Sequence, residues 1–143
     1  MPASARHSAH WRGLALRVGG SRDGYARGVL RTWMDRYVAA WNSNDPEEIG
    51  ALFTDDALYY TEPFAPPWRG RKEIIEQWLA RKDEPGQTTF EWQPLVVTPE
   101  LAVVVGTVAY REPPTVYSNL WVMRLDEIGR CREFTEWWME HPA

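Results

Sequence analysis

Two acids and one tyrosine of this chain are set among aromatic residues in a way that suits proton transfer. Glu62 closes the extended stretch ALYYTE, Glu136 lies within CREFTEWWME, and Tyr37 lies within RYVAAW. Among apolar rings a carboxyl group loses hydration, which raises its pKa and prepares it to exchange protons near neutral pH. A tyrosine hydroxyl can donate a hydrogen bond to a developing enolate oxygen. This set of groups would suit enolisation, isomerisation or an aldol-type cyclisation.

Each of these residues also has a purely structural interpretation. Tyr37 could be a core residue whose hydroxyl is satisfied by a neighbour. Glu62 could cap a turn before Pro63. Glu136 could form an ion pair with Arg132, two residues away on the same strand face. The residues alone leave these alternatives open.

Three helices are predicted ahead of most of the strands. Apolar residues at intervals of three and four favour a helix over 25–42, and similar spacing favours another over 71–82. Between them, Asp45 is expected to cap a helix that runs to Phe53, with Pro46 at its first position and Glu48 completing a capping box. These helices should bury one face each.

Extended runs with short turns make up the rest of the chain. A first strand is predicted over 57–62, where Pro63 should end it, and four more over 88–98, 101–110, 116–125 and 130–139. Strands that follow one another through short turns form an antiparallel meander. We therefore expect an α+β fold in which three N-terminal helices pack on a strongly curved antiparallel sheet to give a cone.

Composition excludes several classes of protein. A chain of 143 residues can form one domain with a proper core, and a net charge of -4 gives no reason to expect nucleic acid. Cys131 is the only cysteine, which excludes an intramolecular disulfide and favours the cytoplasm. No apolar run is long enough to span a membrane. The histidines show no metal-ligand spacing and no phosphate-binding loop is present, so we expect neither metal nor cofactor.

The start of the chain differs from the remainder. Residues 1–22 carry four arginines and no acid. We expect residues 1–23 to be a flexible basic extension and residues 24–143 to form the folded domain. A targeting or partner-binding arm is the alternative.

The segment from Arg36 to Phe64 resembles a known superfamily. RYVAAW, LFTDDA from Leu52 to Ala57, and the pair Glu62-Pro63 are similar to the start of the nuclear transport factor 2-like superfamily, which includes SnoaL-type polyketide cyclases and ketosteroid isomerase. The resemblance implies a cystatin-like α+β barrel, a small apolar or aromatic ligand, and a homodimer that associates through the outer face of the sheet. Leu120 and Val122 would lie on that outer face.

The resemblance also implies which residues line the cavity. Matching the turn at Gly129 turns Glu136 inward, as the expected catalytic acid, with Glu62 and Tyr37 in support. The expected ligand-binding residues come from most elements of the fold: Trp41, Tyr59, Phe64, Trp78, Trp92, Tyr117, Asn119, Trp121, Arg132, Phe134 and Trp138.

Two departures from the isomerase pattern limit the functional expectation. An indole, Trp121, stands where a second acid would be expected, and one extra residue separates Ala57 from Glu62. Steroid isomerisation is therefore not expected. We expect a SnoaL-like small-molecule-binding protein, suited to cofactor-free isomerase or cyclase chemistry on a polyketide-like or other cyclic carbonyl compound. A non-catalytic ligand-binding or interaction module, and epoxide hydrolase-like water activation by Arg132 and Glu136, remain the alternatives.

Overall fold

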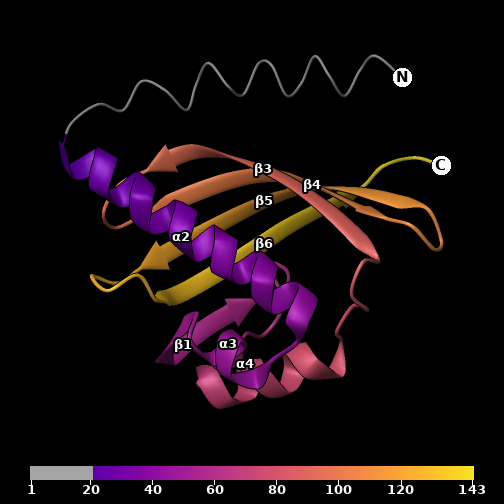
Figure 1. Cartoon of the computed structure of the whole chain (residues 1–143), viewed down its shortest axis with the longest axis horizontal. Coiled ribbons are helices and arrows are strands. Elements are labelled where there is room, and N and C mark those ends of the chain that lie inside the picture. Colours follow the sequence, from indigo (N-terminus) through magenta and orange to yellow (C-terminus); the bar gives the residue numbers. More distant parts are fainter. Residues whose placement is uncertain (1–20) are drawn as a thin grey trace.

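The computed structural model describes residues 21–143, which form helices packed against one sheet (Figure 1). The helices are α2 (Ser21–Ser43), α3 (Pro46–Gly50) and α4 (Gly70–Ala80). The strands are β1 (Phe53–Tyr60), β2 (Trp68–Arg69), β3 (Thr88–Val97), β4 (Ala102–Tyr110), β5 (Thr115–Leu125) and β6 (Cys131–Glu140). The predicted α+β class is confirmed. The predicted extension lies outside the described residues except for 21–23, which belong to α2.

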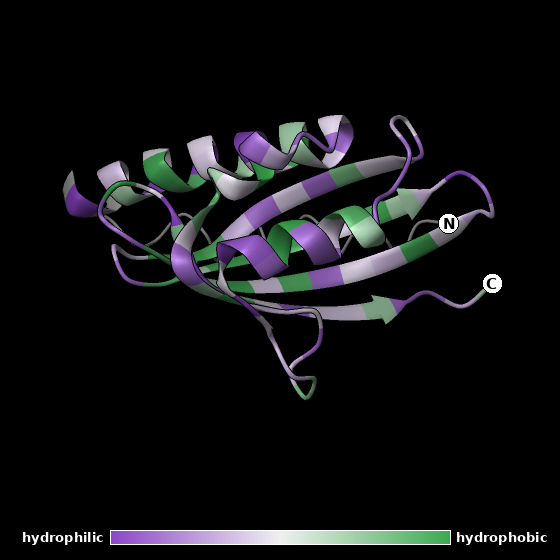
Figure 2. Cartoon of the chain, turned by 90° about the horizontal axis from the view of Figure 1, so that it is seen from below, coloured by the Kyte–Doolittle hydropathy of each residue, from purple (hydrophilic) through white to green (hydrophobic). Residues whose placement is uncertain are grey.

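Helix α2 crosses one face of the sheet, as Figure 1 shows. Its buried residues include Leu30, Trp33, Met34, Tyr37 and Ala40, at the three- and four-residue spacing of a single helix face. Figure 2 shows apolar and polar residues interspersed along the same helices and strands, as amphipathic elements require. None of the helices between residues 21 and 143 has the length and hydropathy needed to cross a membrane.

Helix α3 begins as predicted and ends early. Asp45 caps it, because its Oδ1 accepts from the Glu47 amide at 2.9 Å. Glu48 does not close the predicted capping box on the Asp45 amide. That amide donates to Ser43 Oγ at 3.1 Å, and Ser43 Oγ donates to Glu48 Oε2 at 2.6 Å. The prediction that this helix reaches Phe53 is wrong, since Phe53 already pairs with β6.

The sheet has the order β2-β1-β6-β5-β4-β3. Strands β3 to β6 form the predicted antiparallel meander. The expectation of an antiparallel sheet is wrong for one pair, because β1 runs parallel to β6. The sheet is therefore mixed, and its edges, β2 and β3, do not close it into a barrel.

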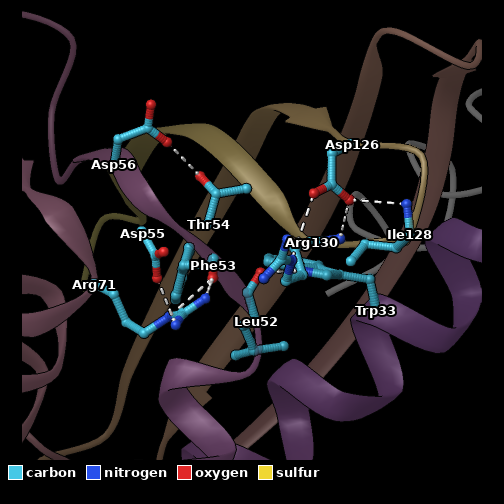
Figure 3. Close-up of polar contacts among 10 residues, drawn as sticks. All are labelled: Trp33, Leu52, Phe53, Thr54, Asp55, Asp56, Arg71, Asp126, Ile128 and Arg130. Carbon is cyan, nitrogen blue, oxygen red and sulfur yellow. Dashed lines mark hydrogen bonds and ion pairs between the residues drawn. The ribbon is translucent and has the colours of Figure 1, made fainter.

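The start of β1 is fixed to both neighbouring helices (Figure 3). Trp33 Nε1 donates to the Leu52 oxygen at 2.9 Å, and Arg71 Nη2 donates to the Phe53 oxygen at 2.8 Å. Arg71 also pairs with Asp55 at 2.7 Å. These contacts set the position of β1, which carries Tyr59 into the interior.

A register shift near the start of β6 changes which side chains face the helices. Arg124 pairs with Glu133 and Leu125 pairs with Cys131, so Arg132 has no partner across β5. Cys131 is buried opposite Leu125, and Arg132, the extra residue at the shift, is exposed. Arg132 does not line the cavity that Glu136 lines, and the expected ion pair between these two residues is not formed.

Candidate functional site

A cavity of about 310 Å³ lies between the helices and the sheet. Aromatic side chains form most of its wall, and the carboxyl groups of Glu136 and Asp83 lie in the same wall. The structure brings nine of the expected site residues to it: Tyr37, Trp41, Tyr59, Trp78, Tyr117, Asn119, Trp121, Glu136 and Trp138. An aromatic cavity with few polar groups is typical of a site for a small organic ligand.

Glu136 lies on β6 directly across from Trp121 on β5. Its Oε1 accepts a hydrogen bond from Asn119 Nδ2 at 2.8 Å. Burial raises the pKa of the Glu136 carboxyl to about 7, although the amide of Asn119 and the indole of Trp121 oppose this by favouring the charged form. The charge of Glu62 raises the pKa further. Glu136 can therefore both accept and release a proton near neutral pH.

The polar atoms beside Glu136 are only partly satisfied. Because Asn119 donates through Nδ2, its Oδ1 faces away from the carboxylate and has no hydrogen-bond partner in the described structure. Trp121 Nε1 is buried and makes no hydrogen bond of normal geometry, yet the indole N–H lies close enough to lower the pKa of Glu136. The Glu136 carboxyl group thus has one hydrogen-bond partner of good geometry, the uncharged side-chain amide of Asn119.

Tyr37 and Tyr59 form a pair of hydroxyl groups in the cavity wall. Their oxygens lie 2.9 Å apart, and either can donate to the other. Burial raises the pKa of both hydroxyls well above their ordinary value. Since one hydrogen bond uses only one of the two protons, the pair retains one O–H that can donate to a ligand. The contact also satisfies the Tyr37 hydroxyl, in line with its structural interpretation.

Glu62 does not line the cavity. β1 ends at Tyr60, so Glu62 lies in the bend that follows, where Thr61 Oγ1 contacts its Oε2 at 3.4 Å. Its influence on the site is electrostatic, through the pKa of Glu136. The structure therefore separates this acid from the position expected of a group that touches a ligand.

Four of the expected ligand-binding residues also lie outside the cavity wall. Phe64 is 87% exposed in the turn beyond β1, and Arg132 is exposed at the register shift of β6. Phe134 is fully buried behind the wall, and Trp92 packs against the core from β3. Arg132 borders a different depression, next to α2 and the end of β5.

Several wall residues were not expected from the sequence, and Asp83 is the most informative. Asp83 Oδ2 accepts from Trp41 Nε1 at 2.8 Å and from the Tyr110 hydroxyl at 3.3 Å. These partners are 42 and 27 residues away in the sequence. No local pattern therefore marked Asp83 as a site residue, and its neighbours in the sequence indicate only a connecting loop before Pro85. Within residues 21–143 no group of three or more acids, histidines or cysteines is placed to hold a metal ion.

A family model described as a SnoaL-like domain matches residues 34–134, which is more than half of the chain. This chain belongs to the SnoaL-like domain family. The match begins at Met34 in α2, includes α3, α4 and strands β1 to β5, and ends at Phe134 in β6. No match is found among curated proteins.

Solved structures share the fold of this SnoaL-like domain. A provisionally assigned ketosteroid isomerase from Kribbella flavida superposes with a TM-score of 0.63 at 18% identity, over 81% of this chain and 82% of its own. A ketosteroid isomerase-like protein from Erwinia carotovora atroseptica gives a TM-score of 0.57 at 19% identity, over 80% and 96%. At these identities the likeness establishes the fold alone.

Proposed function

We propose that this SnoaL-like domain is a cofactor-independent acid-base enzyme that binds a small cyclic carbonyl compound of polyketide type. Glu136 is its proton-transfer group. The observation that carries the proposal is a carboxyl group in the wall of an aromatic cavity, with a pKa raised by burial to about 7 and a neutral amide as its hydrogen-bond partner.

The chemistry begins with the ionised form of Glu136. Its carboxylate removes a proton from the carbon next to the substrate carbonyl, and the electron pair of that C–H bond moves to the carbonyl oxygen as an enolate. The spare O–H of the Tyr37 and Tyr59 pair stabilises this oxygen by donating a hydrogen bond. In isomerisation, neutral Glu136 then returns its proton to another carbon. In cyclisation, the enolate carbon attacks a second carbonyl of the same substrate, and the proton goes to the new alkoxide.

The polar contacts of Glu136 favour this proposal over a binding module without turnover. In a module of that kind the acids of the cavity would be expected to form ion pairs. Glu136 takes part in neither of the ion pairs found within residues 21–143, which join Arg71 to Asp55 and Arg130 to Asp126. The bond between the Tyr37 and Tyr59 hydroxyls is the observation that supports the binding module, because it satisfies one of the supposed catalytic groups. Epoxide hydrolase-like water activation needs Arg132 beside Glu136, and Arg132 lies outside the cavity.

Proton exchange on a simple cyclic ketone tests the proposal. The protein should speed the exchange of the C2 protons of 1-tetralone in D₂O, followed by NMR. Since the carboxylate is the base, the rate should rise with pH through about 7. Glu136→Gln keeps the shape but removes the titrating group, and should slow the exchange by roughly 100-fold with little change in ketone affinity.

Glu140→Gln is the matched control, because Glu140 is an exposed acid on the same strand. It should exchange the ketone protons like the wild type. Equal exchange rates in wild type and Glu136→Gln, or no exchange above the uncatalysed rate in the wild type, would contradict the proposal.

A further inference from the structure

Asp83 is a second acid in the cavity wall, and the proton transfer described above does not use it. It lies shortly after α4 and is held by residues from three other segments. Trp41 Nε1 and the Tyr110 hydroxyl donate to its Oδ2 at 2.8 and 3.3 Å, and Asn44 Nδ2 donates to its backbone oxygen at 3.1 Å. The position of this carboxylate is therefore fixed by the tertiary structure.

Both side-chain hydrogen bonds of Asp83 end on the same oxygen. Among the described residues, no hydrogen bond or ion pair involves Oδ1 of Asp83. An indole N–H can only donate, so the contact with Trp41 requires Oδ2 to be an acceptor, and the other oxygen of a carboxylate is an acceptor as well. A ligand in the cavity would meet an unused hydrogen-bond acceptor at this place.

Asp83 and Glu136 belong to separate parts of the cavity. Glu136 is contacted from β5, by Asn119 and Trp121. Asp83 is instead contacted from α2 and β4, by Trp41 and Tyr110. Tyr37 lines the same cavity, and burial and the charges of both acids raise the pKa of its hydroxyl. A flat ligand that presents one end to Glu136 can therefore reach toward Asp83 within the same cavity.

The cations near the cavity are less suited to anchor that end of a ligand. Arg81 and Lys82 border the cavity, but both are exposed. The Arg81 guanidinium lies over the Trp68 ring at 5.4 Å from its centroid. Exposed, flexible cations bind weakly compared with a carboxylate that is already held in place.

We infer that Asp83 selects ligands that carry a hydrogen-bond donor, a hydroxyl or amino group, at the end of the ring system remote from the reacting carbonyl. The inference rests on the proposed function, which sets the other end of the ligand at Glu136. It narrows the substrate class to hydroxylated or amino-substituted cyclic ketones. Asp83 acts in this as a specificity residue and takes no part in the proton transfer.

Two ketones that differ in one group provide the test. 6-Hydroxy-1-tetralone can donate a hydrogen bond to Asp83, whereas 6-methoxy-1-tetralone cannot. A hydrogen bond to a charged acceptor should make the wild type bind the hydroxy compound about tenfold more tightly or better, measured by calorimetry. Asp83→Asn can still accept from Trp41 through its oxygen, but it presents an NH₂ group in place of the free acceptor. The preference should therefore disappear in this variant.

Two further variants separate Asp83 from its surroundings. Glu84→Gln changes the next acid along the chain, which is exposed and outside the cavity wall, and should keep the preference. Tyr110→Phe removes one of the two hydrogen bonds that hold the Asp83 side chain, and should weaken the preference less than Asp83→Asn does. If Asp83→Asn does not fold, the wild-type comparison still tests the inference, because equal affinity for the two ketones would exclude it.

Some results would overturn the inference. They are equal affinity of the wild type for the two ketones, or no binding of either. Tighter binding of 6-carboxy-1-tetralone than of the hydroxy compound would assign this end to Arg81 and Lys82 instead. Exchange of the C2 protons, measured in the same samples, reports on the proposed function separately. A wild type that keeps the hydroxyl preference without catalysing exchange would refute the enzyme and retain Asp83 as a binding residue.

Discussion

The protonation of Glu136 reflects two opposing effects within a few ångströms. Burial among aromatic rings disfavours the charged form, while the Asn119 amide and the Trp121 indole favour it. Burial is the larger effect, and the pKa rises. The balance leaves a buried carboxyl group that accepts one hydrogen bond of normal geometry, from Asn119 Nδ2. Such a group weakens the fold at the pH where it is charged.

This cost predicts a pH-dependent gain in stability for Glu136→Gln. The pKa of Glu136 rises from 4.5 to about 7 on folding, so between these values the folded protein binds more protons than the unfolded chain, and stability falls as pH rises. Glutamine has no charge and escapes this loss. Relative to wild type, the variant should be more stable at high pH: the difference in free energy of unfolding should be roughly 1–3 kcal/mol larger, in favour of the variant, at about pH 8 than at about pH 5.

Urea unfolding at the two pH values measures this difference. Glu140→Gln, on the exposed end of the same strand, should show no such change with pH. An equal effect of Glu136→Gln at both values would mean that the carboxyl group is not desolvated in the folded protein.

Tyr37→Phe should lower catalysis less than Glu136→Gln does. The Tyr59 hydroxyl remains and can turn its proton toward the ligand, so we expect roughly a tenfold loss in the exchange rate. Losing a buried hydrogen bond should also cost about 1 kcal/mol of stability. Tyr37→Phe combined with Tyr59→Phe removes both protons and should lower the exchange rate further than either change alone. If the double variant exchanges like the wild type, neither hydroxyl contacts the enolate.

At the scale of the elements, the cavity wall depends on how β3, β4 and β5 align. Gly106 on β4 pairs with Trp92 on one side and Asn119 on the other. A Cβ at this position would lie 2.5 Å from Cε1 of Phe90 and 3.1 Å from the backbone oxygen of Glu91. Phe90 in turn stacks on Trp121 with ring centroids 5.0 Å apart. The absence of a side chain at Gly106 therefore allows the ring that backs the site to lie flat.

Gly106→Ala should displace Phe90 and disturb Trp121. We expect a loss of roughly 1–3 kcal/mol in the free energy of unfolding, together with a change in the near-ultraviolet circular dichroism of the tryptophans. Gly86→Ala is not a suitable control, because Gly86 has a φ of +79°. Gly28→Ala is suitable, since no atom lies within 4 Å of the added Cβ and the position is helical. Unchanged stability and spectra for Gly106→Ala would contradict this role.

At the scale of the whole molecule, the face of the sheet opposite α2 carries exposed apolar residues. On β6, Trp137 is 52% exposed and Met139 is 70% exposed. Trp137 pairs across the strands with Leu120, and Val122 lies two residues further along β5. We propose that a second copy of the chain covers this patch, because an exposed apolar surface of this kind favours association.

Light scattering at micromolar concentration should give the mass of a dimer. Leu120→Lys places a charge at the centre of the patch and should yield a folded monomer, since the side chain does not reach the core or the cavity. Arg31→Ala, an exposed change on α2 on the other face of the sheet, should leave the dimer intact. A wild-type monomer, or a dimer that persists in Leu120→Lys, would contradict this interface.

Local patterns in the sequence determined most of the fold. The spacing of apolar residues in α2, the Asp45 cap and the short turns of the meander all act over a few residues, so they can be recognised without coordinates. Such patterns do not choose the inward face of β5, which the resemblance to the superfamily supplied and where Asn119 and Trp121 are buried. They did not give the parallel pairing of β1 with β6, because strand partners distant in the chain leave no local signal.

The tertiary structure decided which candidate residues meet. Glu136 reached the cavity because the register shift at Arg132 precedes it, and Glu62 did not because β1 ends two residues earlier, at Tyr60. Asp83 joined the site through contacts with Trp41, Asn44 and Tyr110, which lie far from it in sequence. The sequence supplied the chemical groups and the periodicity of the elements. Which groups share one desolvated cavity depended on strand register and long-range hydrogen bonds, which exist only once the chain has folded.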